Sequence, residues 1–541
     1  MKNSRFLLCL SMSAVALLSS CVTPKKKTKK TSTSIENVTS KEVSSHSVAS
    51  SSISNVSSET ISSTQGSSSV ISSAHVSISS APISSASHIS SSSRPSSSSQ
   101  SQPSSSQVTP PEDDYVEIPT LTKRMPAEFE PCELVKMCYP EMMNASVYKE
   151  IAKDNKILLL CNKGNFNQSR INEAKQWVSS NQMNEENFTY LDIDLGDDQS
   201  YWVRDFSPFY VYNNLDLGVV DFTYNRDRDE QDAVPKQLAT YFNMSYSKMN
   251  LTHTGGNLMQ DGRGTAFSDN LVLQENSNNK TNVCSQMSSY TGTDNYVITI
   301  DPQGDYIAHV DCWAKIVAPD KIIVAKLPET NSRYQYYEQV ANELGNLKCC
   351  YGYNYRIYRV DEPGGSTVAP YTNSLIANKH VYLPLGSNES YNQKAIQVYQ
   401  DALPGYTIHA INNSSGSLAF KNTDALHCRT HEVPSKKNVF IDSREVLHGE
   451  VSSSSKLLVK CNVVSYDKQS LKSVKLYYSI NDGAYQSIDM SKYKETSNYT
   501  FEFTSLNVGD SVKYYIEAED GGTKNADPVF EEMDPHSFKI V

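Results

Sequence analysis

A serine-dominated tract that begins near residue 31 and ends near residue 107 sets the first limit on what this chain can fold into. It holds almost no apolar side chains, so burial cannot offset the entropy that would be lost on ordering it. We therefore expect a flexible, extended tether here. Of the 541 residues, roughly 430 remain to form cores, which suggests two domains.

The chain begins with the pattern of a secretory signal. Lys2 and Arg5 precede a short apolar run that ends in small residues before Cys21. The run is too short to span a bilayer as a helix, and the cysteine at the cleavage zone resembles the lipidated first residue of a bacterial lipoprotein. The alternative is an ordinary signal peptide with a chance cysteine. We expect a signal peptide over 1–20, a Lys-rich and then Ser-rich disordered tether over 21–115, and an extracytoplasmic protein that is lipid-anchored to the bacterial cell envelope, at the cell surface.

Charge and cysteine count narrow the functional classes. The net charge of −11 argues against nucleic acid as a partner, whereas the lysine-rich stretch 25–30 suits anionic lipid headgroups. Eleven cysteines are present, and nine would remain after signal removal and lipidation of Cys21. Because nine cannot all pair, at least one thiol stays free. Their irregular spacing does not resemble a small disulfide scaffold.

Residues 449–541 have the pattern of a β domain. Apolar and polar residues alternate in short runs, and Asp482-Gly483 between two of them predicts a hairpin. The predicted strands cover 456–464, 473–480, 499–506 and 511–520. Strands of this kind suggest an immunoglobulin-like β-sandwich, which we interpret as a brace, a spacer or a weak adhesion module.

Residues 116–448 have the pattern of an α/β domain, because strand-like apolar runs alternate with amphipathic helix-like runs. The strand-like runs cover 156–161, 321–327, 380–385 and 438–442. The helix-like runs cover 169–182, 334–346 and 392–403. Periodicity alone does not distinguish an open sheet from a barrel or a propeller.

One cysteine of this domain has potential cations on both sides. In the stretch TDALHCRTHE, Cys428 follows His427 and precedes Arg429 and His431. Positive charge near a thiol lowers its pKa and favours the reactive thiolate. A zinc site is not expected, because no second ligand pair at finger-like spacing accompanies Cys428 and His431.

Three further segments place polar residues in apolar or aromatic surroundings: they hold Trp202 with Asp205, His309 with Asp311, and Asn373. Taken singly, each is more often a structural pairing. Together they form a set, because a nucleophilic cysteine needs a histidine nearby, paired carboxylates bind a planar guanidinium, and an indole ring stacks on it. The predicted substrate group is a guanidine, attacked at its central carbon by the thiolate.

In this order, the segments resemble the guanidino-group-modifying superfamily, and specifically the Porphyromonas-type peptidylarginine deiminase family. The wider resemblance to agmatine deiminases begins at PAEFEPCELVKMCYP (126–140), continues through HTGGNLMQDGRGTAFSDN (253–270) and ends at HCRTHEVP (427–434). It implies a five-fold pseudosymmetric α/β propeller as the catalytic domain, followed by an immunoglobulin-like domain. It also implies that the chemistry needs no metal and no organic cofactor.

The resemblance implies a role for each candidate residue. Cys428 resembles the nucleophile that forms a covalent thiouronium, and His309 resembles the general acid and base. Asp205 and Asp311 resemble the carboxylates that clamp the guanidinium, and Asn373 resembles a residue that orients the site. The implied products are citrulline and ammonia.

Arg226 and Arg228 bear on the choice of substrate. In an extended segment both side chains point to the same side, where a free α-carboxylate would bind them bidentately. In the resembling family an Arg-x-Arg pair at this place recognises the carboxylate of a C-terminal arginine, with proline expected where Asp227 stands. Tyr306 matches a family position that lines the substrate site. The alternative is that the two arginines pair with neighbouring acidic residues.

We therefore expect a surface-anchored hydrolase that deiminates arginine-containing peptides or proteins and prefers C-terminal arginine. Three alternatives stay open at this point. The first is a deiminase of free agmatine or arginine. The second is a thiol protease-like or transglutaminase-like enzyme that uses Cys428 and His309. The third is a non-catalytic surface binding protein.

Overall fold

The computed structural model describes residues 116–164, 168–197, 201–304 and 306–541. The predicted signal peptide, Cys21 and the serine tract lie outside the described residues, so lipidation and location stay predictions. Within the described part, no helix combines the length and the apolar character needed to cross a membrane. Among the described residues, none of the nine cysteines is joined in a disulfide.

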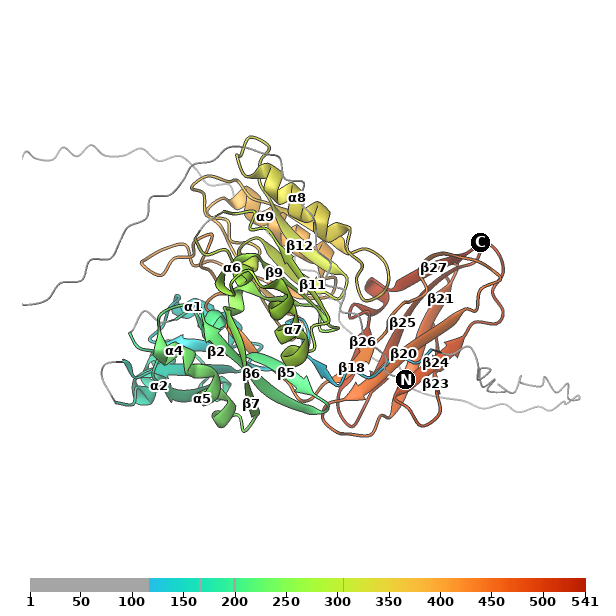
Figure 1. The fold of residues 1–541 in the computed structure, drawn as a ribbon, viewed down its shortest axis with the longest axis horizontal. Helices are drawn as coiled ribbons and strands as arrows, with labels where there is room; N and C mark the ends of the chain where they lie inside the picture. Colours follow the sequence, from blue (N-terminus) through green and yellow to red (C-terminus); the bar gives the residue numbers. More distant parts are fainter. Residues whose placement is uncertain (1–115, 165–167, 198–200, 305) are drawn as a thin grey trace, which may run out of the picture. The chain divides into compact units, whose positions relative to one another are not determined.

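The α/β part of the chain contains one structural unit five times. In each unit two strands pair antiparallel, a helical segment follows, and a third strand returns parallel to the second. In Figure 1 these units run in colour from cyan at β2 to light orange at α9. The alternation predicted from the sequence is thus confirmed as α/β.

We number the units by the order of their central strands. Unit 1 contains β17 (His431–Pro434), β2 (Cys132–Tyr139), β3 (Ile157–Asn162), β4 (Phe188–Ile193), α1 (Ala145–Ile151), α2 (Ile171–Ser180) and the 3-10 turn η2 (Glu185–Asn187). Unit 2 contains β1 (Lys123–Arg124), β5 (Phe209–Asn213), β6 (Asp216–Tyr224), β7 (Ser245–His253), α4 (Asp229–Asp232) and α5 (Val234–Tyr241), and α3 (Val203–Phe206) precedes it.

The remaining units are smaller. Unit 3 contains β8 (Met259–Gln260), β9 (Thr265–Asp269), β10 (Asn295–Thr299), α6 (Leu271–Glu275) and α7 (Lys280–Thr291), preceded by the 3-10 turn η3 (Gly255–Asn257). Unit 4 contains β11 (Ala314–Ala318), β12 (Lys321–Lys326), β13 (Arg356–Asp361) and α8 (Tyr334–Gly345), preceded by η4 (Val310–Cys312). Unit 5 contains β14 (Leu375–Ala377), β15 (His380–Pro384), β16 (Thr407–Ile411) and α9 (Glu389–Ala402).

Local sequence explains why these elements form. Strand β3 is a continuous apolar run and is buried along its whole length, as expected for a strand inside a parallel sheet. Helix α8 buries Tyr337, Val340, Ala341 and Leu344, which recur with the period of a helix. Helix α9 begins where the side chain of Asn388 accepts a hydrogen bond from the backbone of the first turn.

The five units form a closed ring. Unit 1 takes β17 from the end of the domain and β2 to β4 from its start. Helix α7 of unit 3 packs against β7 of unit 2, and α9 of unit 5 packs against β13 of unit 4. The ring closes between units 5 and 1, where Asn378 donates a hydrogen bond of 3.0 Å to Asn155. This topology agrees with the five-fold arrangement that the resemblance implies.

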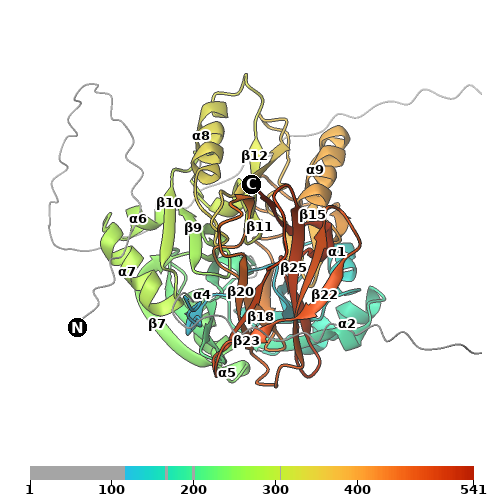
Figure 2. The ribbon, with the colours of Figure 1, turned by 90° about the vertical axis from the view of Figure 1, so that its right-hand side faces the viewer.

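The C-terminal region is all-β and mostly antiparallel (Figures 1 and 2, orange to red). One sheet contains β18 (Val439–Asp442), β20 (Leu458–Ser465), β24 (Asn498–Glu502) and β23 (Ser491–Lys492). The other contains β19 (Gly449–Val451), β27 (His536–Ile540), β25 (Ser511–Glu519), β21 (Ser473–Ile480), β22 (Gln486–Asp489) and β26 (Lys524–Asp527), and η5 (Glu531–Met533) lies beside it. Side chains of both sheets share one buried core.

One strand lies in a different sheet from the one expected. We assigned residues 438–442 to the α/β domain, but β18 pairs antiparallel with β20 in the C-terminal region. An apolar run of this length fits either kind of sheet, so only the strand with which it pairs decides to which domain it belongs. The predicted hairpin at Asp482-Gly483 is confirmed as the turn between β21 and β22.

Candidate active site

Each of the five units contributes one residue to a common site. These residues lie shortly before an antiparallel strand of their unit: Cys428 before β17, Asp205 before β5, Gly256 before β8, His309 before β11 and Asn373 before β14. Residues far apart in the sequence meet there because the same position of each unit faces the centre of the ring.

A cavity of about 240 Å³ opens at this centre. Its lining residues are Trp202, Asp205, Tyr224, Arg226, Arg228, Tyr306, Ile307, His309, Lys421, Thr423, Asp424 and Cys428. Seven of the nine candidate catalytic and substrate-binding residues are among them. The other two, Asp311 and Asn373, are fully buried and contact the thiol from behind.

The thiol of Cys428 is held by two polar side chains. Nδ2 of Asn373 donates to Sγ at 3.2 Å, and Oδ1 of Asn373 accepts the backbone N–H of Cys428 at 3.2 Å. Oδ2 of Asp311 lies 3.7 Å from the same sulfur. Only 3% of Cys428 is exposed. The orienting role expected of Asn373 has a direct geometric basis.

The cations next to Cys428 in the sequence do not surround its sulfur. His427 contacts Asp311 and Glu128 at 2.8 and 3.1 Å. Arg429 is paired with Asp424 at 2.7 Å. Burial and then the carboxylates of Asp311, Asp205 and Asp424 raise the pKa of Cys428 well above its ordinary value. The expectation of a thiol pKa lowered by its sequence neighbours is therefore wrong, because the fold turns their charges to other partners.

His309 has one ring nitrogen engaged and one free for a reaction. Its Nδ1 lies 3.7 Å from Oδ1 of Asp205. Its Nε2 is buried and has no hydrogen-bond partner among the described residues. Burial raises the pKa of Asp205, and the charge of His309 opposes that rise. An unpaired nitrogen in the wall of a cavity is suited to exchange a proton with a ligand.

Gly256 is a site residue to which we assigned no role from the sequence. Its N–H donates to Oδ1 of Asp205 at 3.2 Å. A Cβ atom here would lie 2.6 Å from Nδ1 of His309 and 2.7 Å from Oδ1 of Asp205, so a side chain would displace both groups. Its signal was visible as paired glycines just before a polar residue and a strand in HTGGN.

A buried chain of charges holds Asp311 behind the thiol. Asp311 contacts His427 at 2.8 Å, and His427 in turn contacts Glu128, which is paired with Lys315. Burial alone would raise the pKa of Asp311, but the hydrogen bond and charge of His427 outweigh it, and the pKa is lowered. Asp311 therefore stays a carboxylate. Glu128 and Lys315 were not among the candidates.

Arg226 and Arg228 both line the cavity, as the spacing predicted. Within the described residues neither forms an ion pair with a carboxylate; Arg226 donates to a backbone carbonyl at 3.3 Å and Arg228 to the Gln231 amide at 3.4 Å. The guanidinium of Arg228 lies 5.1 Å from the ring centre of Trp202. Trp202 thus already stacks with a cation of the protein. Tyr306 lines the same cavity and is 84% exposed.

Comparisons with known proteins agree with this geometry. Residues 124–434 match the family model described as Porphyromonas-type peptidyl-arginine deiminase. A Legionella pneumophila protein assigned as an agmatine deiminase is 24% identical over 345 residues, which are 57% of this chain and 94% of the relative. A solved agmatine deiminase of Enterococcus faecalis has a TM-score of 0.50 at 19% identity and covers 58% of this chain and 96% of its own. A solved protein of Porphyromonas gingivalis assigned as an arginine deiminase has a TM-score of 0.50 at 16% identity, with coverages of 58% and 98%. These two structures support the α/β fold.

Proposed function

Because the chain belongs to the Porphyromonas-type peptidyl-arginine deiminase family and is therefore a deiminase hydrolase of guanidino groups, we propose that it converts peptide arginine, preferably C-terminal arginine, to citrulline and ammonia. The observation that carries the substrate proposal is the pair Arg226 and Arg228, two cations that line the cavity and form no ion pair with a carboxylate among the described residues. The α-carboxylate of a C-terminal arginine would supply that partner.

The proposed reaction begins with the guanidinium in the cavity beside the carboxylate of Asp205, while the buried carboxylate of Asp311 lies next to Sγ of Cys428. Sγ of Cys428 attacks the central carbon and forms a C–S bond. The C–N bond to one nitrogen breaks, and this nitrogen leaves as ammonia with a proton from Nε2 of His309. The product of this step is a thiouronium that is covalently attached through Sγ of Cys428, and Asn373 holds this sulfur in position.

Water completes the proposed cycle. His309, now neutral, accepts a proton from a water molecule that attacks the same carbon. The C–S bond breaks, the ureido group of citrulline is released, and Cys428 regains its thiol state. The two carboxylates stabilise positive charge on the guanidinium and the thiouronium throughout.

Because the pKa of Cys428 is raised, the substrate itself would help to activate the thiol. In the free site the buried sulfur faces Asp311, Asp205 and Asp424, which favour the neutral thiol. A bound guanidinium adds positive charge beside the sulfur, so it favours the thiolate. The nucleophile would then form when the substrate is in place, with the proton of the thiol released to solvent.

Two of the alternatives fit the geometry less well. A thiol protease pairs its cysteine with a histidine, but within the described residues no hydrogen bond joins Cys428 to His309, which faces Asp205 instead. Agmatine lacks the carboxylate of C-terminal arginine and carries a cationic amine at that end, which Arg226 and Arg228 would repel.

The test compares citrulline formation by the purified full-length protein on a peptide ending in arginine, on the same peptide with arginine internal, and on agmatine. We expect the first substrate to have the highest kcat/KM and Cys428→Ala to be inactive. Loss of one charge-assisted carboxylate contact costs about 10- to 100-fold, so Arg226→Ala and Arg228→Ala should each lower kcat/KM by that factor for the first substrate only.

The matched control is Arg359→Ala, which removes an arginine that is paired with Glu338 and does not line the cavity. A preference for agmatine would keep the chemistry and overturn the proposed substrate. Absence of citrulline with all three substrates would overturn the proposed reaction and favour the binding-protein alternative.

We also propose that the enzyme is anchored by a lipid on Cys21 and that its C-terminal region is an immunoglobulin-like brace. The anchor rests on the signal pattern alone. The brace is supported by the shared core of the two C-terminal sheets and by their contacts with unit 3. Metabolic labelling with a fatty acid should mark the wild-type protein and leave Cys21→Ala unlabelled.

A further inference from the structure

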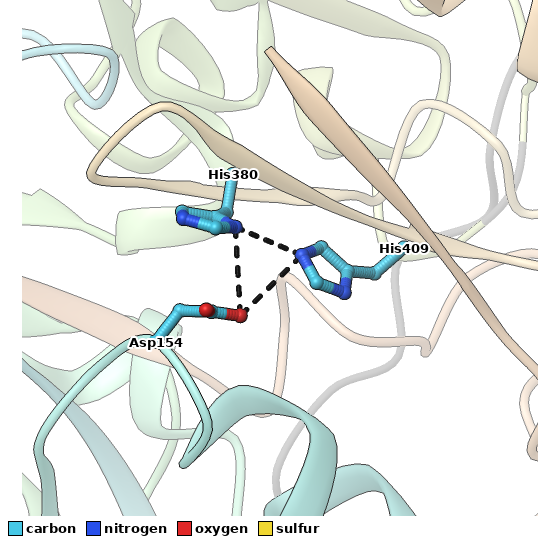
Figure 3. Close-up of side chains that lie close together, drawn as sticks. All are labelled: Asp154, His380 and His409. Carbon is cyan, nitrogen blue, oxygen red and sulfur yellow. Dashed lines mark hydrogen bonds and ion pairs between the residues drawn. The ribbon is translucent and has the colours of Figure 1, made fainter. Parts of the chain in front are cut away.

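Three potential metal ligands meet outside the cavity described above. They are Asp154, His380 and His409, and none of them lines that cavity. One ligand atom of each lies within 4.8 Å of the other two. Figure 3 shows the carboxylate and the two imidazole rings pointing towards one another from separate segments of the chain.

The ligands belong to the two units between which the ring closes. Asp154 lies in the turn between α1 and β3 of unit 1. His380 begins β15 and His409 lies in β16, neighbouring parallel strands of unit 5 in which His409 is level with Tyr382. Tyr382 stacks on the His409 ring with 4.7 Å between the ring centres. Both imidazoles are thus held on strands, as a preorganised site requires.

The distances suit a small coordinated cation. Nδ1 of His380 and Nε2 of His409 are 2.9 Å apart, and each lies 3.5 Å from Oδ2 of Asp154. In a tetrahedral site with bonds of about 2.0 to 2.2 Å, the ligand atoms lie about 3.3 Å from one another. The three atoms therefore form one face of such a site, and the partial exposure of their side chains leaves a fourth position open to solvent.

A further carboxylate contacts the outer nitrogen of one histidine. Nδ1 of His409 lies 3.0 Å from Oε1 of Glu150, so Nε2 is the nitrogen that faces His380 and Asp154. A histidine held by a carboxylate through its outer nitrogen is the usual arrangement behind a metal ligand.

We propose that Asp154, His380 and His409 bind one divalent transition-metal ion, with zinc as the best fit, and that the ion ties unit 5 to unit 1. Two imidazoles with one carboxylate favour zinc, cobalt, nickel or copper over calcium or magnesium, which prefer oxygen ligands. The ion has a structural role and takes no part in the deimination chemistry.

The test uses the full-length protein after treatment with a chelator. Titration with Co²⁺ and Zn²⁺ should show one equivalent bound, and the Co²⁺ spectrum should lack thiolate charge-transfer bands. His380→Ala and His409→Ala should weaken binding at least 100-fold, and Glu150→Gln about 10-fold through loss of the outer contact. Cys428→Ala should bind as the wild type does, which separates this site from the catalytic thiol.

The matched control is His448→Ala, which removes an exposed histidine outside the cluster and should leave binding unchanged. Zinc should raise the Tm of the wild type and of the control variant but not that of His409→Ala, or of His409→Gln if the alanine variant does not fold. The proposal is overturned if no ion binds, if binding survives both histidine substitutions, or if it is lost in Cys428→Ala.

Discussion

Oδ2 of Asp311 lies 3.7 Å from Sγ of Cys428, so the thiol faces a carboxylate rather than a cation. Asp311 stays ionised because His427 lowers its pKa against the effect of burial. The same negative charge, added to burial, raises the pKa of Cys428. Cys428 is therefore expected as a neutral thiol in the free site, and positive charge that enters the site would favour its thiolate.

Cys428 should react faster with a cationic alkylating reagent than with a neutral one. We expect chloroacetamidine to modify Cys428 at pH 7 at least tenfold faster than iodoacetamide, after each rate is divided by its rate with glutathione. The amidinium places positive charge where the guanidinium binds and favours the thiolate. The rates are measured by mass spectrometry of the labelled peptide.

Asp205→Asn provides the internal check on that result. It removes one of the charges that raise the thiol pKa, so the normalised preference for the cation should fall and the iodoacetamide rate should rise. A neutral resting thiol is contradicted if iodoacetamide labels the wild type rapidly and the labelling rate already rises with pH below about 8.5, the ordinary pKa of a thiol.

His427 should act as a positioning residue for Asp311. His427→Gln removes the contact of 2.8 Å that holds the carboxylate and lowers its pKa. We expect kcat/KM to fall by about 10- to 100-fold, in line with loss of a charge-assisted hydrogen bond. The ascending limb of the pH profile should also move, because the charge next to the thiol changes. His448→Ala should show neither effect, and a loss of activity with an unmoved profile would indicate a merely structural role.

The C-terminal region should stabilise the α/β domain through one buried ion pair. Arg263 of unit 3 contacts Asp527 at 2.8 Å, and the hydroxyl of Tyr351 donates to the same carboxylate at 2.6 Å. Asp527→Ala leaves a buried guanidinium without its partner, which costs about 3 to 5 kcal/mol. The free energy of unfolding is measured with urea.

The matched control is Lys513→Ala, which breaks the exposed pair with Asp482. Exposed pairs contribute about 0 to 1 kcal/mol. Equal losses in the two variants would show that Arg263 and Asp527 do not connect the domains.

Stability should fall as the pH drops from about 6.5 to 4 because of His253. Burial lowers the pKa of this histidine to about 4. Its Nδ1 lies 2.9 Å from the carbonyl oxygen of Thr254, and this contact opposes the lowering, but burial outweighs it. The unfolded chain, with a pKa near 6.5, binds the proton first, so stability is complete above that pH and is lost as the pH approaches the folded value.

The expected loss from His253 is about 3 kcal/mol, since each pKa unit corresponds to about 1.4 kcal/mol. His253→Gln should flatten this part of the curve of Tm against pH, while His448→Ala should leave it unchanged. An unaltered slope in His253→Gln would assign the acid loss to other groups.

Local sequence patterns were sufficient to predict several of the helices and strands. The helices α2, α8 and α9 and the strands β3, β12 and β15 lie where periodicity predicted them, because burial of one face repeats with the geometry of the backbone. Strand β18 was assigned to the wrong sheet, since an apolar run does not specify its pairing partner.

At the candidate active site, too, residue type could be read from the sequence, whereas spatial proximity could not. The candidates Cys428, His309 and Asp205 were found because their residue types fit one chemistry, and the cavity contains all three. Gly256 was missed as a site residue, because its importance lies in the space that a Cβ atom would take from His309 and Asp205.

By itself the sequence determined which chemical groups are present and which segments form strands and helices, because residue type and periodicity are local properties. The tertiary structure alone decided which way the charges point. It turned His427 and Arg429 towards Asp311 and Asp424, brought carboxylates to the sulfur of Cys428, and gathered Asp154, His380 and His409 at the closure of the ring. Electrostatic effects depend on distance and burial, and neither is set by position along the chain.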